Sequence, residues 1–217
     1  MEKPRVKICC IQSIEEAKLA IRHGASALWL VSEMPSGPGP ILEERIAEIA
    51  AAVPHGVETF LLTSKQDPDA VIDQQRKTKV TTLQLVDSFP LDGYTSLRRF
   101  LPGIRIVQVI HVAGGNSLKE AMMTAGHVDA LLLDSGNPSL ATKELGGTGR
   151  THDWKISRQI CEAVDVPVFL AGGLKAENVR QAIDAVGPFG VDVCSGVRTS
   201  GMLDKPKLKA FFDAINK

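Results

Sequence analysis

The chain of 217 residues is 44% hydrophobic and 23% charged, which is enough apolar material for a sizeable core without disulfides or metal. Its 25 basic and 25 acidic residues give a formal net charge of zero, which argues against an extended nucleic-acid-binding surface. It has no N-terminal apolar signal segment and no run of about 18 apolar residues, so we expect a cytoplasmic protein that does not bind membranes.

Short β-branched segments alternate with segments of helical period along the whole chain, a pattern that predicts parallel strands joined by helices. The first strand is expected at residues 6–11, and the helix after it at residues 13–24, where Ser13 and Glu16 have the spacing of a capping box. Further strands are expected at residues 27–31, 57–62, 82–86, 105–112, 130–134, 167–171 and 191–194. The intervening helices are expected at residues 41–53, 68–78, 94–101, 118–126, 154–164, 176–186 and 206–215.

Eight strand and helix units can close as a (β/α)₈ or TIM barrel, a fold that usually takes about 250 residues. We therefore predict one α/β barrel domain over residues 1–217. A doubly wound open sheet is the alternative, although no GxGxxG motif follows the first strand. The turn-rich residues 36–40 form a short loop and not a domain linker.

In a barrel of this kind the reacting groups lie at the carboxyl ends of the strands. Asp134 ends the apolar run Ala-Leu-Leu-Leu, where burial would favour its protonated form and suit it to general acid catalysis. Capping of a turn is an equally good explanation for Asp134 alone. Cys9 ends the first strand, where its thiolate could act as a base, although buried cysteines are most often small apolar fillers.

The four cysteines lack CxxC spacing, so we expect reduced thiols and neither disulfides nor zinc ligands. Strand parity predicts that only one of Cys9 and Cys10 points into the barrel. Cys161 and Cys194 are expected to pack in the core. The histidines also lack ligand spacing, and we expect no metal site.

Glycine-rich turns follow the last three predicted strands. The segment at residues 144–153 contains Gly147, Gly149 and Arg150, which could approach an anion, although a simple lid would have the same composition. The loops after strands seven and eight commonly bind phosphate in this fold. The turns at Gly172-Gly173 and Ser195-Gly196 therefore predict a phosphate site.

The motifs together resemble those of the phosphoribosylanthranilate isomerase family, in order and over nearly the whole chain. The matching segments are VKICCI at residues 6–11, LLLD at 131–134, GGTG at 146–149 with DW at 153–154, LAGGL at 170–174 with ENV at 177–179, and VDVCSGV at 191–197.

The resemblance implies a cofactor-free Amadori rearrangement of N-(5-phosphoribosyl)anthranilate in tryptophan biosynthesis. It implies that Cys9 is the general base at C2 of the sugar and that Asp134 is the general acid at the ring oxygen. Asp192 is similar to a carboxylate that contacts substrate. The expected partner is a small phosphorylated sugar derivative bound by a monomer or homodimer. The phosphate would be held near Gly172, Gly173, Ser195 and Gly196.

The sequence departs from the family at the end of the pocket that would hold anthranilate. Cys10 replaces a glycine, Arg198 replaces a glutamate, the loop at residues 34–41 lacks the usual arginine, and residues 84–87 lack the usual histidine. Loss of a hydrogen bond to a carboxylate costs about 1.5–3 kcal/mol.

These departures leave three hypotheses. The chain is a divergent isomerase in which Arg198 or Arg150 supplies the missing charge, or an isomerase-like enzyme for a different phosphorylated sugar derivative, or a barrel that binds a phosphorylated ligand without turnover. The presence of both Cys9 and Asp134 argues against the third hypothesis.

Overall fold

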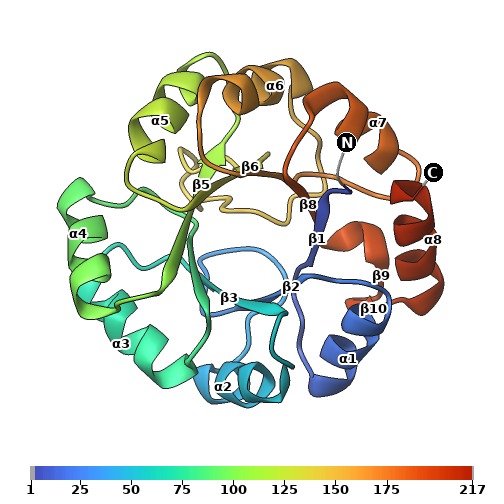
Figure 1. Cartoon of the computed structure of the whole chain (residues 1–217), viewed down its shortest axis with the longest axis horizontal. Helices are drawn as coiled ribbons and strands as arrows, with labels where there is room; N and C mark the ends of the chain where they lie inside the picture. Colours follow the sequence, from blue (N-terminus) through green and yellow to red (C-terminus); the bar gives the residue numbers. More distant parts are fainter. Residues whose placement is uncertain (1–2, 217) are drawn as a thin grey trace.

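Eight parallel strands close into a barrel surrounded by helices in this computed structural model, which describes residues 3–216 (Figure 1). The predicted (β/α)₈ architecture is confirmed, and the open sheet is excluded. Residues 1, 2 and 217 of the predicted domain lie outside the described residues. The barrel strands are β1 (Arg5–Ile8), β2 (Ala27–Val31), β3 (Glu58–Thr63), β4 (Thr82–Leu85), β5 (Arg105–His111), β6 (Ala130–Asp134), β7 (Val168–Leu170) and β8 (Gly190–Val193).

Helices follow the strands in alternation and form the outer ring of Figure 1. After β8 come a 3₁₀ turn, η1 (Ser195–Val197), and a small antiparallel pair, β9 (Arg198–Thr199) and β10 (Met202–Leu203). The helices are α1 (Ile14–Arg22), α2 (Glu43–Ala52), α3 (Pro68–Thr78), α4 (Leu91–Phe100), α5 (Asn116–Ala125), α6 (Trp154–Ala163), α7 (Val179–Val186) and α8 (Lys205–Ile215).

Pairing of β1 with β8 closes the barrel, as expected for the first and last strands. The two strands run parallel, with Lys7 opposite Asp192 and Ile8 opposite Val193. The sequence pattern predicts a first strand that reaches residue 11, but β1 ends at Ile8. The reason is local, because Cys10 adopts a left-handed backbone conformation with φ of 61°.

Several helix and strand ends differ by one to three residues from the sequence prediction, and two local features have identifiable causes. Helix α7 begins at Val179 and not at residue 176, because the Asn178 side chain accepts from Lys175 N at 2.9 Å and donates to Gly173 O at 3.0 Å. The capping box of α1 is only half formed. Ser13 accepts from Glu16 N at 3.1 Å, whereas the Glu16 carboxylate accepts from Gln12 N.

Apolar side chains fill two layers, one between barrel and helices and one inside the barrel. The inner layer contains Lys7, which is fully buried. Its Nζ lies 3.9, 4.1 and 4.4 Å from the ring centroids of Trp29, Phe60 and Phe169, and donates to Gln84 Oε1 at 3.2 Å. Burial lowers the pKa of Lys7 to about 7, while the charge of Asp192 opposes that shift.

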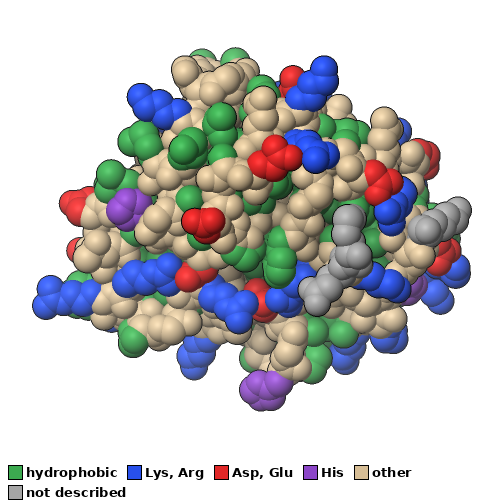
Figure 2. All heavy atoms as spheres, turned by 45° about the horizontal axis from the view of Figure 1, so that its top comes forward, with side chains coloured by type: hydrophobic (Ala, Val, Ile, Leu, Met, Phe, Trp, Pro, Cys, Tyr) green, Lys and Arg blue, Asp and Glu red, His purple; other side chains and the backbone are tan. Residues whose placement is uncertain are grey.

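The outer surface agrees with the neutral charge balance. Figure 2 shows basic and acidic side chains interspersed over the visible face. Within residues 3–216, none of the helices combines the length and the hydropathy needed to cross a membrane.

Lys7→Met should make the free energy of unfolding depend less on pH between pH 7 and pH 10. The pKa of Lys7 is about 7 in the folded protein and about 10.4 when unfolded, so the unfolded chain binds more protons between these values. The stability of the native sequence, relative to Lys7→Met, should therefore rise from pH 7 to pH 10 by about 1 kcal/mol or more per pH unit. Urea unfolding at several pH values measures this difference, with exposed Lys209→Met as the control. A difference that stays constant with pH would contradict it.

Candidate active site

A pocket opens where the barrel strands end, and most of the predicted site residues line it. Its wall contains Cys9, Asp134, Gly147, Gly149, Gly172, Gly173, Asp192 and Ser195. Trp29 and Gln84 also line it, together with residues 36–38 of the loop after β2. None of the lining side chains is a lysine, arginine or histidine.

Asp134 stands at the end of β6 with its carboxyl group almost completely buried. Its Oδ1 accepts from Ser135 N at 2.7 Å. Burial raises the pKa of Asp134, and the Ser135 hydrogen bond opposes this only in part. Oδ2 faces Gly146, where a Cβ atom would lie only 2.9 Å away. The carboxyl group can therefore hold a proton and has one oxygen beside the glycine-rich loop.

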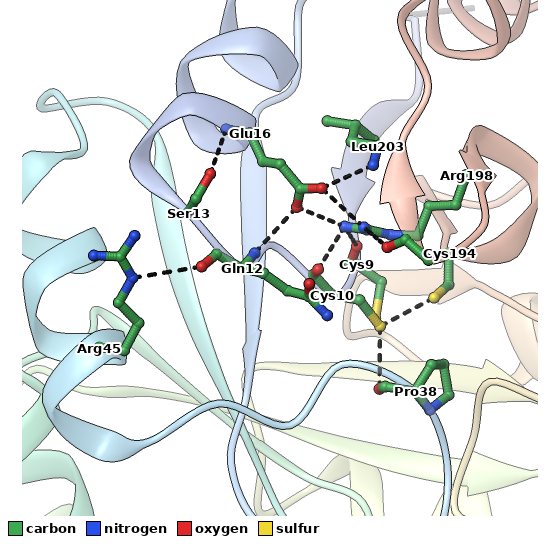
Figure 3. Close-up of polar contacts among 11 residues, drawn as sticks. Cys9, Cys10, Gln12, Ser13, Glu16, Pro38, Arg45, Cys194, Arg198 and Leu203 are labelled. Atoms are coloured by element: carbon green, nitrogen blue, oxygen red, sulfur yellow. Dashed lines mark hydrogen bonds and ion pairs between the residues drawn. The ribbon is translucent and has the colours of Figure 1, made fainter.

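The cysteines at the end of β1 differ from the parity prediction. Both Cys9 and Cys10 line the pocket, because the left-handed backbone at Cys10 breaks the strand alternation. The expectation that Cys194 only packs in the core is also wrong. Cys194 lines the pocket, with its Sγ 3.0 Å from Cys10 Sγ (Figure 3). Cys10 Sγ also lies 3.4 Å from Cys9 Sγ.

The three thiols shift one another's pKa values through these contacts. Hydrogen bonds from Cys10 and Cys9, aided by the nearby Arg198, lower the pKa of Cys194 to about 4. Burial raises the pKa of Cys9. These shifts favour negative charge on Cys194 over Cys9.

Asp192 reaches the pocket from β8. Burial raises the pKa of its carboxyl group, against the opposing charge of Lys7 on the neighbouring strand. Its buried Oδ1 has no hydrogen-bond partner among the described residues. An unpartnered acceptor of this kind is costly in an empty pocket and is suited to a substrate hydroxyl group.

The glycine turns bring three loops together at one side of the pocket. Gly147, Gly149, Gly172 and Gly173 all have positive φ values, between 62° and 85°. A Cβ atom on Gly173 would lie 2.7–2.9 Å from backbone atoms of residues 149–151, so this glycine is needed for the two loops to pack. Gly196 does not line the same pocket, and a Cβ there would lie 2.1 Å from Leu174 O.

The two arginines expected to supply charge lie outside the pocket wall. The buried Arg198 donates to the Glu16 carboxylate at 3.0 and 3.1 Å and to the carbonyl oxygens of Cys9 and Cys10 at 3.1 and 2.5 Å (Figure 3). Arg150 is exposed and paired with Glu144. This placement disagrees with the expectation that either arginine faces a substrate carboxylate.

The sequence reasoning missed Trp29 and Gln84 and set Cys194 aside. Cys194 directly follows β8, so the rule that places reacting groups at strand ends does include it. Trp29 and Gln84 lie within β2 and β4, and no sequence signal separates them from other core residues.

A closed (β/α)₈ barrel with a buried acid, a thiol and glycine turns at the strand ends has the architecture of a barrel enzyme. A family model described as N-(5'phosphoribosyl)anthranilate (PRA) isomerase matches residues 6–214. The chain belongs to the N-(5'-phosphoribosyl)anthranilate isomerase family.

Individual relatives agree with this assignment. The chain is 38% identical to the N-(5'-phosphoribosyl)anthranilate isomerase of Haloferax volcanii, over 97% of this chain and 92% of that protein. It is 37% identical to that of Methanocella arvoryzae, over 89% of this chain and 88% of that protein. The solved phosphoribosyl anthranilate isomerase of Thermotoga maritima is similar with a TM-score of 0.83 and 28% identity, over 98% of both chains.

Arg198→Met should destabilise the fold by about 3–5 kcal/mol, because it leaves the buried Glu16 carboxylate without its cationic partner. Adding Glu16→Met to Arg198→Met should recover part of the loss, because the unpaired charge is then removed. Urea unfolding of the two single variants and the double variant measures this coupling. A loss in the double variant that equals the sum of the two single losses would show that the two side chains are not coupled.

Proposed function

We propose that the chain isomerises N-(5'-phosphoribosyl)anthranilate to its 1-deoxyribulose form in tryptophan biosynthesis. The observation that carries the proposal is that a buried carboxyl group, Asp134, and a thiol, Cys9, line one pocket at the ends of β6 and β1. A family structure at 27% identity and a TM-score of 0.80 is described as a complex with reduced 1-(o-carboxyphenylamino)-1-deoxyribulose 5-phosphate, which supports a substrate of this class.

The proposed reaction begins with ring opening. Asp134 gives its proton to the furanose ring oxygen, the C1–O bond breaks, and the nitrogen lone pair forms a C1=N iminium. Cys9, as a thiolate, then removes the proton from C2, and the released electron pair forms the C1=C2 bond and neutralises the nitrogen. The Asp134 carboxylate then takes the 2-hydroxyl proton and the Cys9 thiol gives its proton to C1, which completes the ketose and restores both groups. All atoms of the substrate are retained.

The other predicted residues have supporting roles in this proposal. The unpartnered Asp192 Oδ1 accepts from a sugar hydroxyl group. Backbone groups at Gly147, Gly149, Gly172 and Gly173, with Ser195, hold the phosphate. The charge on Cys194 lies two sulfur contacts from Cys9, and a proton shift along them gives the thiolate form of Cys9.

The pocket wall gives specific support to a second candidate, an isomerase for a different phosphorylated sugar derivative. Within the part of the chain that the structure describes, no lysine, arginine or histidine side chain lines the pocket to meet the anthranilate carboxylate. A phosphoribosyl aniline that lacks the carboxylate distinguishes the candidates. A true anthranilate pocket should favour the natural substrate by about 10-fold or more in kcat/KM, as expected for a hydrogen bond to a charged group.

The setting of the enzyme follows from the same proposal. A biosynthetic isomerase of small metabolites would act in the cytoplasm. A monomer or a homodimer is compatible with the family, since one structure is described as monomers generated from the dimeric enzyme of Thermotoga maritima.

Cys9→Ser and Asp134→Asn should each lower kcat by about 10²–10⁴ and change KM only modestly, because each group acts mainly in the transition state. Steady-state assays with N-(5'-phosphoribosyl)anthranilate measure this, with Cys161→Ser as the control outside the pocket. Cys10→Gly, the residue usual in the family, should stay within about tenfold of the native rate. If Cys9→Ser keeps its activity and Cys10→Gly loses it, the assignment of the base to Cys9 is wrong.

Ser195→Asp should weaken binding of a phosphorylated substrate, because it places a carboxylate beside the proposed phosphate site. KM should rise by about 100-fold or more, as expected for several kcal/mol of like-charge repulsion, while kcat changes less. Ser195→Ala is the matched control, and inorganic phosphate as a competitive inhibitor gives a second readout. An unchanged KM would place the phosphate elsewhere.

A further inference from the structure

Three cysteine side chains from distant parts of the chain converge at one wall of the pocket. Cys9 and Cys10 follow β1, and Cys194 follows β8. Their sulfur atoms all lie within 4.8 Å of one another, with Cys9 Sγ 3.4 Å from Cys10 Sγ. Figure 3 shows the shortest contact, 3.0 Å between Cys10 and Cys194. The proposed isomerisation uses this cluster only to supply a thiolate at Cys9, so what else three adjacent sulfurs can bind is a separate question.

The spacing suits a metal ion bound by sulfur. With metal–sulfur bonds of about 2.3 Å, tetrahedral geometry places the sulfurs about 3.8 Å apart. The separations of 3.0 and 3.4 Å are both shorter than that value and the third is within 4.8 Å, so small rotations of the thiol side chains bring the sulfurs to the distances of one shared ion. Soft thiolate ligands select zinc and copper(I) over magnesium or calcium.

The backbone at Cys10 is a second, independent observation. Its φ of 61° lies in the left-handed region, which costs a non-glycine residue free energy, and strain of this kind is typically found at functional sites. The loop opposite accommodates the side chain, because a Cβ on Gly39 would come within 2.7 Å of Cys10 Cβ and 2.9 Å of its Sγ. The strained backbone turns the Cys10 sulfur toward Cys194.

Charge compensation is also in place. The Arg198 guanidinium donates to the carbonyl oxygens of both Cys9 and Cys10. Three thiolates around a zinc ion carry a net charge of −1, and around copper(I) a net charge of −2. The buried Arg198 cation lies beside the ligands and lowers the energy of that negative charge, while its partner Glu16 offsets part of this effect.

We propose that Cys9, Cys10 and Cys194 form a binding site for a thiophilic metal ion such as zinc or copper(I). Each sulfur binds as a thiolate, and the displaced thiol protons pass to solvent. The fourth position of a tetrahedral ion faces the pocket, where water can occupy it. An ion bound to Cys9 also blocks isomerisation, because the base is then occupied. This inference of inhibition rests on the proposed function of Cys9 as the base.

Cadmium is the probe for binding, because cadmium thiolates absorb in the ultraviolet. Titration of the reduced protein with Cd²⁺ should give a thiolate charge-transfer band that saturates at one ion per chain. Cys194→Ser and Cys10→Gly should each weaken the affinity by about 100-fold or more, which is at least the loss seen when groups supporting a metal ligand are removed. Cys161→Ser, which removes a thiol outside the cluster, should bind like the native protein. Equal affinity in all four proteins, or no charge-transfer band, would overturn the site.

Activity provides the separate test of inhibition. Zn²⁺ should inhibit the native enzyme and Cys161→Ser, with recovery on addition of EDTA. The fold inhibition, measured relative to each variant's own metal-free rate, should be much smaller in Cys194→Ser and Cys10→Gly. Cadmium binding without inhibition would uphold the metal site and contradict the role of Cys9 as base. Normal turnover without cadmium binding would overturn the metal site and leave the proposed isomerase intact.

Discussion

The buried ion pair between Arg198 and Glu16 is the interaction on which the geometry of the site depends. Arg198 follows the turn after β8, Glu16 lies in α1, and the guanidinium also binds the two carbonyl oxygens that follow β1. The Arg198 side chain thus links the segment after β8 to the Cys9-Cys10 turn after β1 and to helix α1. A buried pair of this kind contributes more to a defined arrangement than to net stability, because desolvation offsets its attraction.

The barrel and half of the site were predictable from sequence because they depend on local patterns. Strand and helix periods repeat eight times, Asp134 ends an unbroken apolar run, and the glycine turns follow strands. The cysteine cluster was not predictable, since parity applies only while the chain remains extended and Cys10 leaves that region. The role of Arg198 depends on a partner 182 residues away, and no local signal indicates such a contact.

The pocket contains the acid and the thiol that the proposed reaction uses, but among the described residues no lysine, arginine or histidine side chain lines it. Asp134, Cys9 and the glycine turns surround the place where a sugar phosphate would react. The loop at residues 36–38 contributes no cation. Lys7 does not line the pocket, and its Nζ packs against the rings of Trp29, Phe60 and Phe169. The acid and the thiol therefore bear on which reaction occurs, whereas the lack of a cation in the loop bears on which aglycone the substrate carries.

Complementation of a tryptophan auxotroph that lacks phosphoribosylanthranilate isomerase tests the central claim most directly, because growth reports the named reaction on its natural substrate. The account predicts growth without tryptophan when the native chain is expressed, and no growth with the folded Asp134→Asn variant. Failure of the native chain to support growth, although expressed and folded, would contradict the claim that anthranilate is the aglycone.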